Sequence, residues 1–206
     1  MPAPAPARRA LCARCTRPLA ACICRWISAL DCQVELLILM HPLEVRNAKG
    51  SARLLHLSLA NAVLVEGESF DPDALAHLLH AGGRTPVLLY PATPGVSAPA
   101  IDARALAQPS TLRLVVLDGT WRKSRKMLHQ NPQLQTLPRL ALSDMPPSQY
   151  LIRKAHAADQ LSTLEASCHA IARLEPGVDV RPLLAAIDDF VAQFQATGGR
   201  LQGPAP

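Results

Sequence analysis

The sequence predicts an α/β domain with a mainly parallel β-sheet and flanking helices. Two observations support this class: short, nearly all-apolar runs recur along the chain, and segments with helical periodicity separate them. Runs that are apolar throughout, instead of alternating with polar residues, are typical of parallel strands buried on both faces. A chain of 206 residues suits one domain of ordinary size with a small additional segment.

Five strands are expected, at residues 34–40, 62–66, 87–90, 114–118 and 140–142. A proline-rich stretch, residues 91–109, follows the third strand and holds four of the 19 prolines. We expect it to run over the surface near the carboxyl edge of the sheet. In open α/β sheets, ligands bind at that edge.

Five segments are expected to be helical from their apolar periodicity or their start signals. The clearest start signal is Ser162, which stands three residues before Glu165, as in a capping box. The expected helices are residues 47–61, 73–80, 121–129, 162–173 and 180–195.

Basic residues gather in two blocks of a chain whose formal net charge is +5. Residues 1–60 carry eight Lys/Arg against three Asp/Glu, and residues 113–160 again carry eight against three. The stretches 61–112 and 161–206 are net acidic, at −3 and −2. This distribution favours a positive surface that binds an anionic partner such as nucleic acid. The alternative is a solvated basic face with no partner.

The sequence holds no segment expected to span a membrane, because the longest apolar run, around residues 34–40, is far too short. Residues 1–9 are rich in proline and alanine and then basic, without the apolar stretch of a secretory signal. We expect them to be a flexible leader, and we expect the protein to be cytoplasmic.

Four of the six cysteines fall within thirteen residues, as Cys12-x₂-Cys15 followed by Cys22-x-Cys24. Four thiolates at this spacing are able to close a tetrahedral zinc site. Such a closed site orients a short segment, here residues 10–30, and has no open position for catalysis. Two disulfides, an iron–sulfur cluster and scattered structural cysteines are the alternatives.

The stretch at residues 114–127 is the best candidate for chemistry. A buried strand ends at Asp118, Gly119 allows a tight turn, and a helix is expected to begin at about Thr120, before Trp121. Amides at such a helix start bind carboxylates. The alternative is a helix-capping aspartate beside a core tryptophan. Four cations follow: Arg122, Lys123, Arg125 and Lys126.

The tetrapeptide Asp118-Gly-Thr-Trp121 resembles the signature of the DTW-domain family, whose members are tRNA-uridine aminocarboxypropyltransferases. Other motifs resemble that family in the same order along the chain. They are the four cysteines, residues 41–44 (His-Pro-Leu-Glu), residues 49–53, Tyr90-Pro91, residues 118–127, and residues 150–154 with 161–165. Where the family usually has Thr-Gly before Arg-Leu, this chain has Gly50, Ser51 and Ala52. The resemblance covers residues 12 to about 170.

The resemblance implies a knotted, SPOUT-like fold in which the C-terminal part is threaded through a loop and S-adenosylmethionine binds at the knot. The catalytic domain would then span residues 31–198, with a tail at 199–206. The implied reaction transfers the 3-amino-3-carboxypropyl group of S-adenosylmethionine to N3 of a uridine in tRNA and releases methylthioadenosine.

Asp118 is the first candidate for the general base that takes the uridine N3 proton, with Glu44 second and His41 third. Asp118 is alternatively a ligand of the donor molecule. The residues expected to bind S-adenosylmethionine are Tyr90, Pro91, Asp118, Gly119, Thr120, Trp121, Leu161, Ser162 and Thr163. Those expected to contact tRNA phosphates are Arg46, Lys49, Arg53, Arg122, Lys123, Arg125, Lys126, Arg153 and Lys154.

Two other functions stay open from the sequence: a SPOUT-type RNA methyltransferase, and a non-catalytic zinc-containing RNA-binding module. The methyltransferase would release S-adenosylhomocysteine, and the binding module would not bind S-adenosylmethionine. The modified uridine and the oligomeric state, monomer or homodimer, also stay open.

Overall fold

The computed structural model describes residues 10–47, 49–92, 98–143, 145–146, 148 and 161–196. Five strands form one sheet in the order β2-β1-β4-β3-β5, and every neighbouring pair is parallel. They are β1 (Glu35–Met40), β2 (Ala62–Glu66), β3 (Thr85–Leu89), β4 (Leu112–Asp118) and β5 (Arg139–Leu140). The predicted α/β class with a parallel sheet and flanking helices is therefore confirmed.

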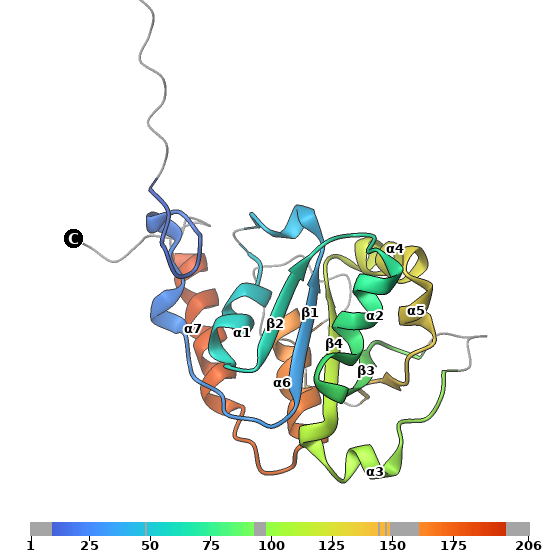
Figure 1. The fold of residues 1–206 in the computed structure, drawn as a ribbon. Coiled ribbons are helices and arrows are strands. Elements are labelled where there is room, and N and C mark those ends of the chain that lie inside the picture. Colours follow the sequence, from blue (N-terminus) through green and yellow to red (C-terminus); the bar gives the residue numbers. More distant parts are fainter. Residues whose placement is uncertain are drawn as a thin grey trace, which may run out of the picture.

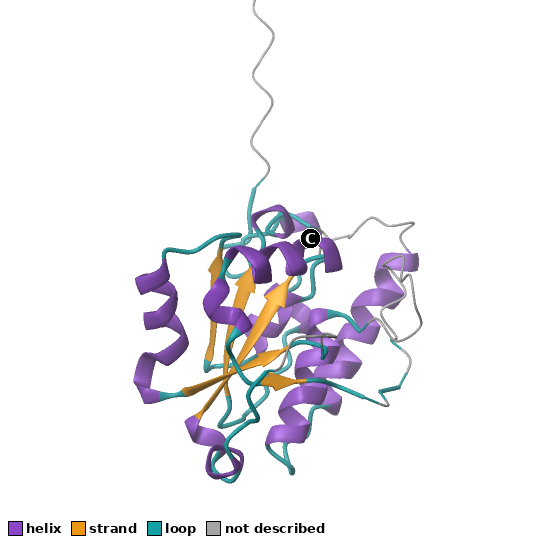
Figure 2. Ribbon diagram, turned by 90° about the vertical axis from the view of Figure 1, so that its right-hand side faces the viewer, coloured by secondary structure: helices purple, strands orange, loops and turns teal. Residues whose placement is uncertain are grey.

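Two groups of helices cover the two faces of this sheet. Leu36, Ile38 and Met40 of β1 join one core cluster, and the alternate residues Leu37 and Leu39 join the other. The first cluster includes α1 (Ala52–Ser58), α6 (Thr163–Leu174) and α7 (Arg181–Ala196), and the second includes α2 (Pro72–His80), α4 (Trp121–Gln130) and α5 (Pro132–Gln135). Figure 1 shows α1 and α7 on one side of the strands and α2, α4 and α5 on the other. Figure 2 shows the strands as a central layer with helices on either side.

Three elements differ from the expected ones for local reasons. Helix α1 begins at Ala52 and not at residue 47, because the chain makes tight turns from Asn47 to Gly50 before it. The proline-rich stretch contains α3 (Ala103–Leu106) and the 3₁₀ turn η5 (Pro109–Thr111), each too short to show a period. Strand β5 has only two residues, 139–140, where three were expected.

The other 3₁₀ turns are η1 (Leu19–Ala21), η2 (Cys24–Trp26), η3 (Pro42–Glu44) and η4 (Ala81–Gly83). Several predictions fall outside the described residues: the leader at 1–9, the cations Arg153 and Lys154, and the tail at 199–206. Most of the chain between β5 and α6 is also outside them.

Candidate active site

Because all five strands are parallel, their carboxyl ends meet at one edge of the sheet. The backbone joins neighbouring ends there: His41 N–H donates to the Asp118 carbonyl (3.0 Å), and Gly67 N–H donates to the Met40 carbonyl (2.9 Å). The predicted motifs at residues 41–44 and 118–121 therefore lie side by side.

Asp118 is the last residue of β4 and is fully buried, at 0 % exposure. The Thr163 hydroxyl donates a hydrogen bond of 2.6 Å to Asp118 Oδ1. A short bond of this kind to a carboxylate is charge-assisted and fixes the orientation of the carboxylate. Two predicted site segments, 118–121 and 161–163, are thus in direct contact across 45 residues of sequence.

The start of α6 is held by the capping box that the sequence predicts. Glu165 N–H donates to Ser162 Oγ (3.2 Å), and Ser162 N–H donates to Glu165 Oε2 (2.7 Å). Ser148 Oγ donates to the same carboxylate. The next amide, Leu164 N–H, donates to Ser51 Oγ at 3.3 Å. The first turn of α6 is therefore tied both to itself and to the start of α1.

The start of α4 is equally fixed. Thr120 caps it, because its hydroxyl accepts from Lys123 N–H at 3.4 Å. A Cβ atom at Gly119 would lie 3.1 Å from Lys123 Cβ and 3.7 Å from His41 Cβ. Glycine at this position thus allows the close approach of helix and loop just after Asp118.

Trp121 lies at the surface and not in the core, with 44 % of its area exposed. Its ring meets that of Tyr90 edge to face, with centroids 5.9 Å apart. The Arg139 guanidinium lies 5.6 Å from the Tyr90 ring centroid, and its Nη1 donates to the Pro91 carbonyl at 3.4 Å. Trp121 therefore offers a supported aromatic face to a ligand.

Three of the cations expected to contact RNA form ion pairs with carboxylates, and two of these cations belong to α4. Lys123 Nζ lies 2.7 Å from Oε1 of Glu44, which is only 3 % exposed, and Asn47 Nδ2 donates to Glu44 Oε2 at 2.6 Å. Lys126 Nζ lies 3.0 Å from Glu68 Oε2. The remaining cations of α4, Arg122 and Arg125, are exposed, as are Arg46 and Lys49, while Arg53 is half-buried beside Glu66.

His41 is held between two partners. Its Nδ1 accepts from Leu43 N–H (3.1 Å), so the ring proton lies on Nε2, which donates to Glu68 Oε1 at 2.9 Å. Hydrogen bonds from Lys126 and then from His41 lower the pKa of Glu68. The sequence analysis missed Glu68, although its place just after the β2 strand was a usable signal.

The four cysteines of residues 10–30, the cysteine segment, lie together as predicted. Their sulfur atoms are all within 4.8 Å of one another, with Cys12 to Cys24 at 3.6 Å and Cys15 to Cys22 at 3.8 Å. Zinc–sulfur bonds of about 2.3 Å in a tetrahedron place the sulfurs about 3.8 Å apart, so the arrangement fits zinc. The backbone amides of Cys15 and Arg14 lower the pKa of the Cys12 thiol to about 6.

The cysteine segment packs against the first core cluster. The Trp26 ring meets Phe190 of α7 edge to face, with centroids 5.0 Å apart. Arg17 donates from Nη2 to the carbonyls of Gly50 (2.7 Å) and Asn47 (3.3 Å). Figure 1 shows this segment beside α7.

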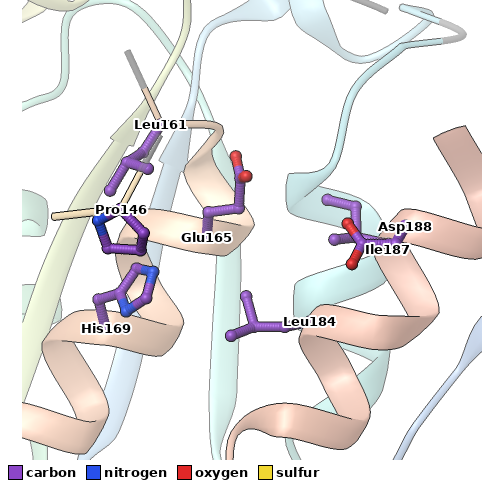
Figure 3. A pocket seen from close by; sticks show the side chains of 7 residues that line it. All are labelled: Pro146, Leu161, Glu165, His169, Leu184, Ile187 and Asp188. Carbon is purple, nitrogen blue, oxygen red and sulfur yellow. The ribbon is translucent and has the colours of Figure 1, made fainter. Parts of the chain in front are cut away.

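A hollow of about 160 Å³ lies between α6 and α7. Figure 3 shows Leu184 pointing from α7 toward α6, with Glu165 and His169 on the α6 side. Burial, followed by the charge of Glu165, raises the pKa of Asp188 there. The predicted donor-binding residue Leu161 lines this hollow, whereas Asp118, Tyr90 and Trp121 do not.

The fold and site define an α/β protein with a fixed, buried aspartate at the carboxyl edge of a parallel sheet and a four-cysteine cluster on one flank. No helix among the described residues is long and apolar enough to cross a membrane. The DTW domain model matches residues 9–195, and the chain belongs to that family.

Relatives with known names match nearly the whole chain. One is tRNA-uridine aminocarboxypropyltransferase 2 of Drosophila melanogaster, 30 % identical over 96 % of this chain and 79 % of its own length. Another is tRNA-uridine aminocarboxypropyltransferase A of Arabidopsis thaliana, 26 % identical over 97 % of this chain and 86 % of its own length. No solved structure gives a significant match.

Proposed function

We propose that this protein is a tRNA-uridine aminocarboxypropyltransferase, which transfers the 3-amino-3-carboxypropyl group of S-adenosylmethionine to N3 of a uridine. The names of its relatives support the reaction and the substrate class. The observation that carries the proposal is the contact between Thr163 and the buried Asp118 carboxylate. It joins the start of α6 to the end of β4, where the DTW signature lies.

The reaction needs one base and firm positioning of the donor. As the bond between uridine N3 and the donor Cγ forms, the Cγ–S bond breaks and its electrons go to sulfur. The leaving group is then neutral methylthioadenosine, and the N3 proton passes to the base. Since a sulfonium also offers its methyl carbon, the position of the donor decides which group is transferred.

Asp118 is the base in this proposal, and Glu44 is the second candidate. Glu44 is buried, but Lys123 and Asn47 already hold its two oxygens. We propose that Glu44 positions Lys123 and thereby the start of α4. Asp118 ends β4 at the carboxyl edge, is fully buried, and has its carboxylate oriented by the Thr163 hydroxyl, which suits a base held in a fixed position.

The donor is expected to lie along the carboxyl edge, between the starts of α4 and α6. The amides of the first turn of α4 suit its carboxylate, and the exposed Trp121 face suits a nucleobase. We propose that it contacts Tyr90, Pro91, Asp118, Gly119, Thr120, Trp121, Leu161, Ser162 and Thr163. The predicted knot would belong to this region.

The cysteine cluster is proposed to hold one structural zinc ion through Cys12, Cys15, Cys22 and Cys24. Zinc bound by four thiolates stabilises a segment without taking part in the reaction. We also propose that residues 10–30 and 31–198 are the structural segment and the catalytic domain.

The tRNA is proposed to bind through cations that face solvent, chiefly Arg46, Lys49, Arg122 and Arg125. Lys123 and Lys126 contribute less, because carboxylates already neutralise them. A tRNA substrate agrees with the predicted cytoplasmic location.

The proposal is tested by mass spectrometry of unmodified tRNA incubated with S-adenosylmethionine and either wild-type protein or Asp118→Asn. Wild type should add one aminocarboxypropyl group to a uridine and release methylthioadenosine. Removal of a general base lowers the rate roughly 10²- to 10⁴-fold, and we expect a loss of that size in the variant. Elemental analysis of the same wild-type preparation should find one zinc ion per chain.

Asp102→Asn is the matched control, because Asp102 caps α3 and asparagine also caps helices. It should keep full activity. A methyl-sized gain on the tRNA would make the protein a methyltransferase, and bound but unmodified tRNA would favour the binding module. Full activity of Asp118→Asn would remove Asp118 from the role of base.

A further inference from the structure

We infer that Arg17 is a positioning residue that links the cysteine segment to the reaction site. It acts through the η3–α1 loop, residues 45–47 and 49–51, which is linked by hydrogen bonds to the start of α6 and, through Glu44 and Lys123, to the start of α4. The catalytic meaning of this inference rests on the proposed function, although the contacts themselves do not.

The Arg17 side chain holds the loop through backbone carbonyls of the loop. Nη2 donates to the carbonyls of Gly50 and Asn47, and Gly50 N–H also donates to the Asn47 carbonyl at 2.9 Å. Hydrogen bonds from a charged donor are stronger than neutral ones, and these close the turn just before α1. One side chain of the cysteine segment thus fixes both ends of this turn.

The loop then reaches the start of α6. Ser51 is 2 % exposed, and its hydroxyl accepts from Leu164 N–H instead of capping its own helix α1. Leu164 follows Thr163, whose hydroxyl donates to Asp118. A shift of Gly50 and Ser51 would therefore move the residue that orients the carboxylate.

The same loop also reaches the start of α4. Asn47 Nδ2 donates to Glu44, and Glu44 pairs with Lys123 in the first turn of α4. Arg17 bonds the carbonyl of the same Asn47. The loop therefore contacts the helix on each side of Asp118, and Arg17 fixes it from outside the site.

The packing around Gly50 leaves the loop little freedom to adjust. A Cβ atom there would lie 3.2 Å from the Asn47 carbonyl oxygen and 3.8 Å from Arg17 Nη2. Gly50 and Ser51 are also the positions where this chain departs from the usual family pattern. Loss of the Arg17 bonds should therefore reach Asp118 and not be absorbed in the loop.

The test compares Arg17→Ala with Arg14→Ala, which removes the same charge from an exposed position of the same segment. Small misplacements in an active site cost up to about a hundred-fold in rate, and we expect about a ten-fold fall in kcat for Arg17→Ala and none for Arg14→Ala. Arg17→Lys should recover part of the rate, since one ammonium replaces only some of the bonds. Metal content should be unchanged in all three.

A direct contact between Arg17 and tRNA would behave differently. It would raise the Kd for tRNA, reduce the salt dependence by about one unit of slope, and leave kcat at saturating tRNA unchanged. That result would overturn the inference. So would an equal fall in kcat for Arg14→Ala, or a lowered unfolding temperature with full kcat.

Hydrogen exchange gives a readout that does not depend on activity. Arg17→Ala should speed exchange at the Leu164 amide, whereas Arg14→Ala should not. If wild type transfers nothing, the proposed function fails while this result still tests the link. In an active enzyme, the losses of kcat from Arg17→Ala and Ser51→Ala should be less than additive, because both act through one contact; additive losses would contradict the link.

Discussion

The two edges of the sheet both carry ion pairs, but they use them differently. At the amino edge, Glu35 pairs with Arg84 at 2.6 Å and with Arg113. Arg113 is buried and also donates to the carbonyls of Leu78 and Ala81. These bonds join the starts of β1 and β4 to the C-terminal end of α2.

At the carboxyl edge, the acidic groups are held by side chains from helix starts and loops. Thr163 bonds Asp118, and Glu68 bridges His41 and Lys126. Two large apolar side chains, Leu43 (72 % exposed) and Trp121, stand in solvent beside them.

The comparison shows that a buried ion pair does not locate an active site by itself. The arginine of the amino edge has carbonyl partners fixed by the backbone, which suits a structural role. The carboxyl edge combines a fixed carboxylate with exposed apolar groups, which suits a substrate. Substitutions at the first edge should therefore change stability, and those at the second should change activity.

Arg113→Ala tests the amino edge and should have the largest effect on stability. Removing one partner of a buried ion pair costs about 3 kcal/mol of unfolding free energy or more, since Glu35 loses one of its two arginine partners and two carbonyls lose a donor. Urea unfolding measures this loss, and kcat per folded molecule should stay near wild type. Arg84→Ala, at a more exposed position, should cost less; an equal cost would argue against the role given to Arg113.

Thr163→Val tests the carboxyl edge with a smaller effect. It keeps the side-chain shape and removes the hydroxyl that orients Asp118, and we expect about a ten-fold lower kcat/KM, equivalent to about 1.4 kcal/mol. Thr163→Ser keeps the hydroxyl and should keep most of the activity. Steady-state rates decide, and equal losses in the two variants would show that the methyl group matters instead.

Glu68→Gln should have the smallest effect on stability, and the size of this effect should depend on pH. Lys126 and His41 lower the pKa of Glu68 in the folded state. The charged carboxylate therefore stabilises the fold fully at pH values above its pKa in the unfolded chain, which is roughly 4.3. This contribution is lost as the pH falls through the lowered pKa. Thermal unfolding should therefore separate wild type from the variant at neutral pH and not in acid. The same difference at neutral and at acid pH would contradict the pairing of Glu68 with Lys126 and His41.

Much of the fold follows from local patterns. The strand runs are apolar because both sheet faces are covered, and Ser162 with Glu165 marks the start of α6 to within a residue. The strand order is not local, because β1 pairs with β4 across more than seventy residues. The late start of α1 was missed because the chain turns before it, where Gly50 N–H donates to the Asn47 carbonyl.

The site residues also divide into those that local motifs predict and those that depend on contacts distant in sequence. Asp118, Thr120 and the cysteines stand in short motifs that can be identified from spacing. Arg17 contacts residues distant in sequence, so no spacing marks it, and Glu68 is marked only by its place just after β2. The ion pairs of Lys123 and Lys126 were hidden for the same reason, and both were predicted to contact RNA.

The edge-to-face contact between Trp26 and Phe190 has a consequence for biosynthesis. The ribosome makes the cysteine segment early and α7 late, so Trp26 emerges long before the ring it packs against. Until α7 has been translated, the apolar side of the segment lacks part of its cover, and incomplete chains with exposed apolar surface aggregate readily. A nascent chain stopped before α7 should therefore depend on chaperones more than the finished protein does.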